Sequence, residues 1–297
     1  MAGELRSRIP EISSLILFVI SALFATFLSS LMISSGVESP PSSGTQGASY
    51  IIYYLIAAIV FSAVVILLGR RKIASILRWI FLAVIAYVVF YVWLFLGAYI
   101  AQTYLEYYIM LFAAPAIMVI LLIFKNEWYV VDAAGFFLVA GISAIWSLII
   151  GVWASVAFLI VFAVYDYIAV YRTKHMVSLA RVAVNEKLPL LFVFPGEKGV
   201  KMSEVTMSDG STDKGGHKML LLGFGDMVFP SIMVVASYLY GRTNPIPFLL
   251  LPLIGAIAGM SVLLFTKVAR PAPGLPLING GAVSGFLIAY LVFNIIL

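Results

Sequence analysis

Two aspartates stand inside apolar stretches of a chain that carries little other charge. Asp166 lies in the apolar run 162–170, and Asp226 lies in the run 222–230. An aspartate near the middle of a membrane-spanning helix costs about 2.5 to 3.5 kcal/mol, so such residues usually face a partner or a water-filled cavity. Neither run contains a Lys, Arg or His that could serve as a counter-ion. The two carboxyl groups are therefore the first candidates for chemistry.

Two carboxyl groups that lie close together in a low dielectric cannot both stay ionised, and such a pair shares one proton. The ionised carboxylate can take a proton from a water molecule that attacks a peptide carbonyl, while the protonated carboxyl donates to the carbonyl oxygen. This is the chemistry of an aspartic protease, and it requires no bound cofactor. The same residues could instead form a proton or cation path in a channel or transporter, and charge placement alone favours neither.

The sequence lacks the residues that other kinds of active site require. There is no Cys, which excludes thiol catalysis and Cys-based metal sites. No His-Glu-x-x-His motif occurs, and both histidines, His175 and His217, lie in a long polar loop, so a zinc protease or an intramembrane Ser/His pair lacks its parts. Asp209, Asp213 and His217 share a four-residue spacing, but their Gly-rich surroundings favour a solvated loop. We therefore predict no metal site.

The composition indicates which solvent surrounds the chain. Of the 297 residues, 63% are hydrophobic and only 10% are charged, against about 25% in soluble proteins, which excludes an ordinary soluble domain. Backbone groups in lipid must bond within their own segment, so the apolar runs are expected to be helices. The sequence predicts an all-α membrane protein, a polytopic bundle of nine transmembrane helices. The predicted spans lie near 12–34, 49–68, 79–100, 104–124, 132–150, 153–171, 219–240, 245–265 and 274–297.

The basic residues predict the orientation of the spans. With a cytoplasmic N-terminus, seventeen of the eighteen Lys and Arg residues fall on the cytoplasmic side, and only Arg242 falls on the opposite side. The net charge of +5 is thus an orientation signal rather than a sign of nucleic-acid binding. We predict a multi-pass cell-membrane protein with a cytoplasmic 172–218 loop and an extracytoplasmic C-terminus.

The spans divide the chain into three parts. Residues 1–171 hold six spans, including Asp166; residues 172–218 form a hydrophilic loop; and residues 219–297 hold three spans, including Asp226. Within the loop, a short apolar run between two prolines, Leu188–Pro195, could form a strand or a membrane-surface segment. Two Gly-x-x-x-Gly motifs, which begin at Gly255 and Gly281, favour helix packing within the chain over a dimer interface.

Three short motifs in the predicted spans resemble a known family. Tyr-Asp in the sixth span and Gly-x-Gly-Asp in the seventh are similar to the motifs of the presenilin and signal-peptide-peptidase family of intramembrane aspartyl proteases. Pro-Gly-Leu at the start of the ninth resembles that family's Pro-Ala-Leu, with Gly in place of Ala. The matching residues are Tyr165, Asp166, Gly223, Phe224, Gly225, Asp226, Pro273, Gly274 and Leu275. The sequence around Tyr165 and in the following loop is most similar to presenilin, and the compact chain suggests a prokaryotic homologue.

The resemblance implies a presenilin-like fold and an aspartic endopeptidase that hydrolyses peptide bonds within the transmembrane segments of other proteins. Asp166 and Asp226 would be the catalytic pair, and Pro273, Gly274 and Leu275 would help to position the substrate. A helical substrate must unwind before hydrolysis, and the strand Leu188–Phe194 is a candidate to hold the unwound peptide. The expected partners are transmembrane helical polypeptides and the lipid bilayer, with no nucleic acid. No obligate partner subunit is evident, and a homo-oligomer remains an option.

Overall fold

A computed structural model describes residues 8–38, 56, 74–125, 127–173, 188–196, 219–266 and 273–296. Six of the described helices are long and apolar enough to cross a membrane, which confirms a largely helical, multi-pass membrane protein. Apart from Ile56, the span predicted near 49–68 lies outside the described residues, as does most of the 172–218 loop, including His175 and His217.

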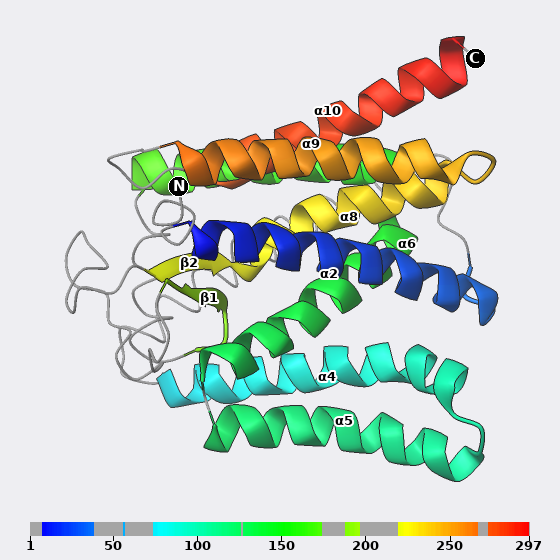
Figure 1. The fold of residues 1–297 in the computed structure, drawn as a ribbon, viewed down its shortest axis with the longest axis vertical. Helices are drawn as coiled ribbons and strands as arrows, with labels where there is room; N and C mark the ends of the chain where they lie inside the picture. Colours follow the sequence, from blue (N-terminus) through cyan, green and yellow to red (C-terminus); the bar gives the residue numbers. More distant parts are fainter. Residues whose placement is uncertain are drawn as a thin grey trace. The chain divides into compact units, whose positions relative to one another are not determined.

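The described elements follow the chain in the order shown in Figure 1. The helices are α2 (Ile9–Ser34), α4 (Ala74–Ile100), α5 (Tyr104–Phe124), α6 (Trp128–Ile168), α8 (Phe224–Tyr240), α9 (Pro245–Phe265) and α10 (Leu275–Tyr290). Two strands, β1 (Leu191–Pro195) and β2 (Met219–Gly223), precede α8. Short π-helical turns follow α6 at Ala169–Thr173 and α10 at Leu291–Ile296.

Helix α6 is broken at Gly151. Its 41 residues would make a straight helix about twice as long as the roughly 30 Å hydrocarbon core of a bilayer. Gly151 adopts φ 70° and ψ 178°, a left-handed backbone that glycine tolerates and other residues rarely adopt. The break falls between the predicted spans 132–150 and 153–171. Residues 128–150 and 152–168 are therefore two helical segments, as the sequence predicts.

The strand pair departs from the predicted all-α fold. β1 and β2 pair antiparallel, with Leu191 opposite Gly223 and Pro195 opposite Met219. The predicted helix over 219–240 is therefore wrong for its first five residues, since α8 begins at Phe224. An apolar run such as Met219–Gly223 does not by itself distinguish a strand from the start of a buried helix. Antiparallel pairing with β1, which lies far away in sequence, makes this run a strand.

The chain divides into two compact units that interleave along the sequence. The first comprises Met1–Leu17, Ser62–Leu138 and Val177–Phe224, and the second comprises Phe18–Phe61, Val139–Met176 and Gly225–Leu297. In the first unit, α4 and α5 form an antiparallel hairpin, visible in Figure 1. At the start of α5, the Thr103 side chain accepts from the Glu106 N–H, and the Glu106 carboxylate accepts from the Thr103 N–H. This reciprocal pair satisfies two backbone donors that a helix start leaves open.

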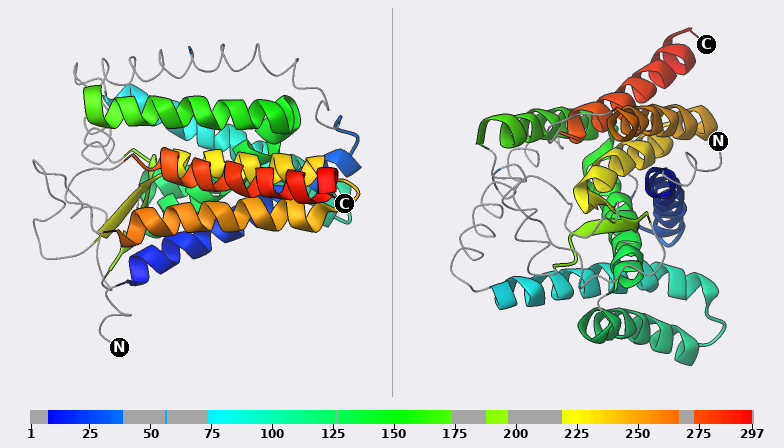
Figure 2. Two further views of the ribbon diagram at one scale, coloured as in Figure 1. Left: turned by 90° about the horizontal axis from the view of Figure 1, so that it is seen from above. Right: turned by 60° about the vertical axis from the view of Figure 1, so that its left-hand side comes forward.

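In the second unit, α9 and α10 lie side by side because glycines remove the side chains between them, as Figure 2 shows. A Cβ atom added at Gly255 or at Gly281 would overlap the backbone carbonyl of the other residue. A Cβ atom at Gly285 would likewise overlap the carbonyl of Leu251. These contacts confirm that the Gly-x-x-x-Gly motifs serve packing within the chain.

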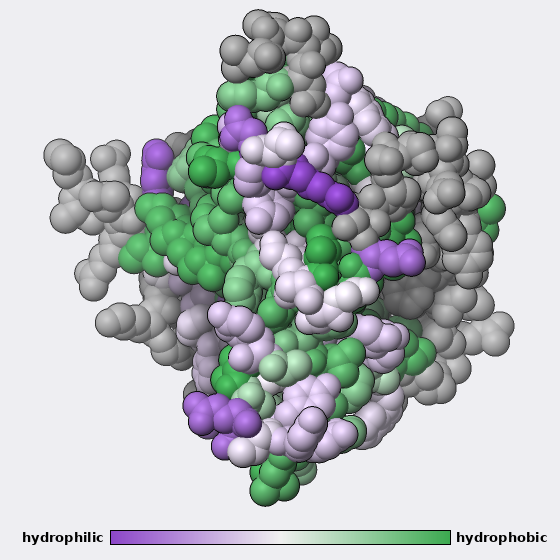
Figure 3. Space-filling view, turned by 90° about the vertical axis from the view of Figure 1, so that its right-hand side faces the viewer, coloured by the Kyte–Doolittle hydropathy of each residue, from purple (hydrophilic) through white to green (hydrophobic). Residues whose placement is uncertain are grey.

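The described surface carries many large apolar side chains. Leu105 and Tyr104 of α5 are among the most exposed, and similar residues follow the outer faces of α2, α4 and α10. On the face drawn in Figure 3, most described residues are coloured hydrophobic or pale, and strongly hydrophilic ones are few. Such a surface is stable next to lipid but would favour aggregation in water.

Candidate active site

Asp166 is a buried carboxylate held by a backbone donor from α10. It lies in the last turn of α6, and its side chain is only 2% exposed. Its Oδ2 atom accepts a hydrogen bond from the backbone N–H of Leu275 at 3.1 Å. Leu275 is the first residue of α10, where backbone N–H groups have no partner inside the helix. The carboxylate therefore satisfies a donor that the start of α10 leaves open.

Asp226 lies in the first turn of α8, two residues after the helix begins at Phe224. The sequence predicts this residue inside a longer span, and the structure moves it to the helix start because β2 replaces the expected first turn. Its side chain is partly buried. The Oδ1 atom of Asp226 lies 3.4 Å from the position that a Cβ atom on Gly274 would take.

Both carboxyl groups therefore meet one short segment, Gly274–Leu275. Asp166 accepts the Leu275 N–H, and Asp226 lies against the Cα of Gly274. The three motifs that the sequence singles out, although separated by long stretches of chain, come together at this point. The two carboxyl groups therefore contact neighbouring residues of the same backbone segment.

Gly274 is needed for its small size rather than for its backbone conformation. Its φ of −79° and ψ of −43° are ordinary right-handed values. An added Cβ atom would lie 3.2 Å from a methyl carbon of Leu263 and 3.4 Å from Asp226, a tight fit that a small shift of the Leu263 side chain could relieve. Alanine, the residue in the family motif, should therefore fit, whereas a larger side chain would press on Leu263 and Asp226.

Aromatic packing and one hydrogen bond hold α6 and α8 together near the two aspartates. The ring of Phe229 on α8 lies 4.8 Å from the ring of Phe162 and 5.6 Å from that of Phe158, both on α6, between ring centroids. The Ser143 hydroxyl donates to the carbonyl of Val228 at 3.2 Å. Such contacts fix the two helices against each other and so restrict the positions of Asp166 and Asp226.

The remaining motif residues contribute to packing. Phe224 donates its N–H to the Leu190 carbonyl at 3.2 Å, and its ring packs on Phe192 of β1 with centroids 4.5 Å apart. A Cβ atom on Gly225 would lie 3.4 Å from the ring of Phe229, so this glycine leaves space for it. The partly buried Tyr165 ring lies 6.2 Å from that of Phe162. Gly223 ends β2, and Pro273 is buried just before α10.

Asp132 makes a hydrogen bond to a distant strand that the sequence reasoning does not predict. The predicted span 132–150 begins at this residue, and water and headgroups solvate a charge at a span end. In the structure its side chain is partly buried, and Oδ1 accepts the backbone N–H of Val193 in β1 at 2.9 Å. Asp132 lies a full turn inside α6, which begins at Trp128, and that depth is the signal that could have identified it.

Among the described residues, no three His, Asp or Glu side chains gather as a metal site would require. The family described as signal-peptide peptidase, presenilin aspartyl protease matches the chain over residues 15–295. The chain belongs to this family. The family description names an aspartyl protease, which agrees with the two aspartates that meet at Gly274–Leu275.

Two solved structures are similar over nearly the whole chain. Both are described as a presenilin family intramembrane aspartate protease, one in space group C222 and one in P2. The first is 26% identical, with 95% of this chain and 99% of that chain covered and a TM-score of 0.64. The second is also 26% identical, with 94% and 96% covered and a TM-score of 0.61. A comparison with curated proteins gives no significant match.

Proposed function

We propose that the protein hydrolyses peptide bonds within transmembrane segments, with Asp166 and Asp226 as the catalytic pair. The observation that carries the proposal is the meeting of both carboxyl groups at Gly274–Leu275. Membership of the family supports the same reaction. A cation path needs no such gathering, since its acidic groups can be spread along the pore.

The two carboxyl groups divide the work of hydrolysis. One is ionised and removes a proton from water as the water oxygen attacks the substrate carbonyl carbon; the other is protonated and donates to the carbonyl oxygen. The peptide C–N bond then breaks, and the nitrogen leaves with a proton. The Leu275 N–H holds the Asp166 carboxylate in one orientation. This fixed orientation lowers the reorganisation that the reaction requires.

The substrate must be unwound at the bond that is cut, and the edge of β2 is the segment we propose to hold it. Leu188–Phe194 is the candidate from the sequence, but Val193 of β1 directs its N–H to Asp132 and so away from β2. In the observed register, Val193 faces Leu221 and Leu191 faces Gly223. In an antiparallel ladder, the two residues of a non-hydrogen-bonded pair direct their N–H and C=O groups away from each other. Leu221 and Gly223 therefore direct these backbone groups to the side of β2 that faces away from β1.

A strand added along β2 would end close to the catalytic pair, because Gly223 is only three residues before Asp226. Backbone hydrogen bonds along such an edge bind an extended peptide with little regard to its sequence. They also supply partners for the N–H and C=O groups that unwinding frees in the membrane.

Purified protein in liposomes, incubated with a transmembrane peptide, tests the proposed reaction. The wild type should cut the peptide, whereas Asp166→Asn and Asp226→Asn should not; mass spectrometry identifies the products. Cleavage that persists in both variants would show that the aspartates are not the catalytic pair. Ion flux through the wild-type protein without any cleavage would favour the channel or transporter.

The pH dependence of cleavage is a second test. Because one carboxyl must be protonated and the other ionised, the rate should rise and then fall with pH in a bell-shaped curve. Each limb should approach a tenfold change per pH unit, as expected for loss of a single required protonation state. A rate that stays constant from about pH 4 to 9 would contradict a shared proton.

A further inference from the structure

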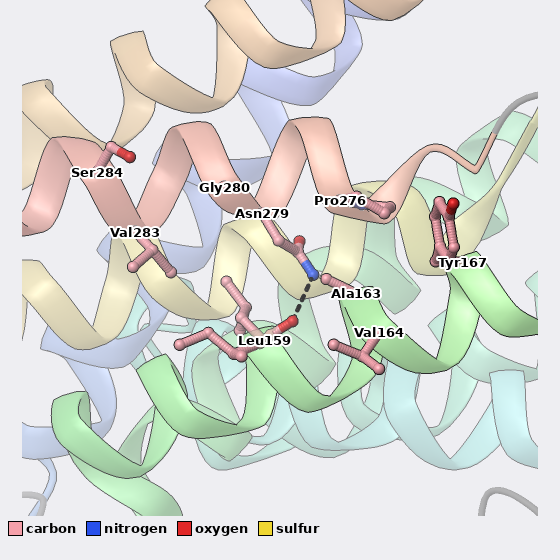
Figure 4. A pocket seen from close by; sticks show the side chains of 10 residues that line it. Leu159, Ala163, Val164, Tyr167, Pro276, Asn279, Gly280, Val283 and Ser284 are labelled. Carbon is pink, nitrogen blue, oxygen red and sulfur yellow. Dashed lines mark hydrogen bonds between the residues drawn. The ribbon is translucent and has the colours of Figure 1, made fainter.

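A pocket of about 440 Å³ lies between α6 and α10, on the face drawn in Figure 4. Its lining is mostly apolar, with Ile160 and Val164 from α6 and Val283 from α10. Asn279 is the amide in this lining, and its side chain is only 1% exposed. A buried amide in apolar surroundings needs partners for both its ends.

Only one end of the Asn279 amide has a partner. Its Nδ2 donates to the backbone carbonyl of Leu159 at 3.3 Å, the dashed line in Figure 4. Because a carbonyl can only accept, the amide must turn its NH₂ group toward Leu159, which leaves Oδ1 as the remaining acceptor. Oδ1 is buried and has no hydrogen-bond partner among the described residues. Asn279 thus contributes to the pocket lining an amide whose acceptor has no partner among the described residues.

The pocket is next to Asp166. Tyr167 and Pro276, which line it, directly follow Asp166 and Leu275 in the sequence. Asn279 lies one helical turn beyond Leu275, about 6 Å along the axis of α10. Its partner Leu159 lies two turns before Asp166, about 10 Å along α6. A substrate helix cut at the aspartates would thus reach Oδ1 some four to seven helical residues away, by roughly 1.5 Å per residue.

The distance from the cut decides which donor can reach Oδ1. Unwinding frees backbone N–H groups only near the scissile bond; further along, a substrate that is still helical uses them internally. The donor must then be a side chain, and the apolar lining excludes charged ones. Ser and Thr are small, carry one hydroxyl donor, and occur in transmembrane helices.

We propose that Asn279 is a specificity-determining residue, which accepts a hydrogen bond from a Ser or Thr hydroxyl of the substrate helix in this pocket. The inference rests on the proposed protease function and names the substrates that it prefers. An enzyme group built to hydrogen-bond a substrate rejects the analogue that lacks the bond, because its own polar atom stays buried and unpaired.

A scan of paired peptides tests this assignment. A transmembrane peptide is made with Thr or Val at each position in turn, since the two side chains have similar shape but only Thr carries a hydroxyl. At one position, roughly four to seven residues from the cut, the wild type should cleave the Thr peptide with a kcat/KM about 5- to 100-fold higher. Asn279→Leu, which has similar size but no acceptor, should cleave both peptides at rates within about a factor of two.

The controls separate a specific contact from a general loss of stability. Asn279→Ala is the second variant, and thermal unfolding shows which variants fold. Asn244→Leu removes an exposed amide, at the start of α9, that makes no capping hydrogen bond, and it should keep the preference for Thr. A merely structural role of Asn279 would lower both rates and leave their ratio unchanged.

Each remaining outcome has a distinct meaning. If the wild type cleaves the peptides but prefers Thr at no position, the inference is wrong and the protease function stands. If the preference survives in both Asn279 variants, another acceptor binds the hydroxyl, and the inference is again wrong. If the wild type cleaves none of the peptides, the proposed function fails and the inference fails with it.

Discussion

Two carboxylates on α6 make the same kind of hydrogen bond but in different surroundings. Asp132 accepts the N–H of Val193 at 2.9 Å, and Asp166 accepts the N–H of Leu275 at 3.1 Å. Each thereby fastens a backbone segment that is far away in sequence. The segment that Asp166 holds also lies against a second carboxyl group, that of Asp226.

The comparison separates two reasons to keep an acid inside a membrane protein. A single carboxylate can serve as an acceptor that anchors a strand, and this is how the structure uses Asp132. Chemistry of the aspartic type needs two carboxyl groups that exchange a proton. An aspartate within a span therefore marks a functional site only together with its partner, and burial alone does not distinguish the two cases.

The largest expected difference comes from the same substitution at both positions. Asp166→Asn keeps an oxygen for the Leu275 N–H but cannot exchange a proton, so cleavage should fall by at least about 10³-fold. Asp132→Asn keeps an oxygen for the Val193 N–H and should leave most of the activity, because that role needs only an acceptor. The measurement is the initial rate on one transmembrane peptide in liposomes.

The double variant Asp166→Asn/Asp226→Asn sharpens this comparison. Residues that act as one unit are not additive, so the double variant should be about as inactive as either single one. A loss equal to the product of the two single losses would mean that the two aspartates act separately. A loss at Asp132→Asn as large as at Asp166→Asn would make Asp132 part of the chemistry.

Gly274 allows a test of the segment that brings the two carboxyl groups together. Gly274→Leu would push a side chain into Asp226, and displacement of a catalytic group by about 1 Å can cost about 10²-fold in rate. Gly274→Ala is the matched control: its methyl group needs only a small shift of Leu263, so activity should stay within about threefold of wild type. Equal activity of the two variants would show that Asp226 does not depend on the space at Gly274.

The edge of β2 is tested at Leu221, whose N–H points away from β1. Leu221→Pro removes this outward donor but spares the β1–β2 ladder, as proline is tolerated where a strand N–H faces outward. Loss of the bond to substrate should lower kcat/KM about 5- to 100-fold. Leu221→Ala removes the side chain and keeps the donor, so it should retain the activity that the proline variant loses. If Leu221→Pro cleaves as fast as Leu221→Ala, the substrate does not pair with this edge.

The sequence predicts most helices well because a membrane span is a long apolar run with few alternatives. The end of the sixth span and the position of Asp166 follow from such runs. The start of α8 does not: Met219–Gly223 is as apolar as the helix that follows, and only its pairing with β1 makes it a strand. The residues around Met219–Gly223 do not indicate that this segment pairs with β1.

The candidate site, like the fold, can be predicted from the sequence only in part. Asp166 and Asp226 are found from the sequence since each is costly in lipid and neither has a local counter-ion. Their meeting at Gly274–Leu275 depends on the packing of α6, α8 and α10, which residue spacing alone does not determine. Asp132 is missed because water can solvate a carboxylate that lies within a turn or two of a span end, so such a residue needs no partner inside the protein. Asn279 is missed because a single Asn in an apolar helix is commonly a packing residue.

The smallest effect is expected when the Asp132 anchor itself is removed. Asp132→Leu leaves the Val193 N–H without its acceptor, and a buried donor left unpaired costs about 1 to 3 kcal/mol. The loss should appear as faster hydrogen exchange at Val193 and its neighbours in β1, together with a lower cleavage rate. Asp132→Asn should restore most of the protection, since it provides an oxygen at the same place.

Exchange in β1 that is equally slow in the wild type and in Asp132→Leu would contradict the anchoring role. If cleavage falls in Asp132→Leu while exchange in β1 is unchanged, Asp132 acts on the reaction by a route other than the strand. The contrast with Asp166 would then no longer hold.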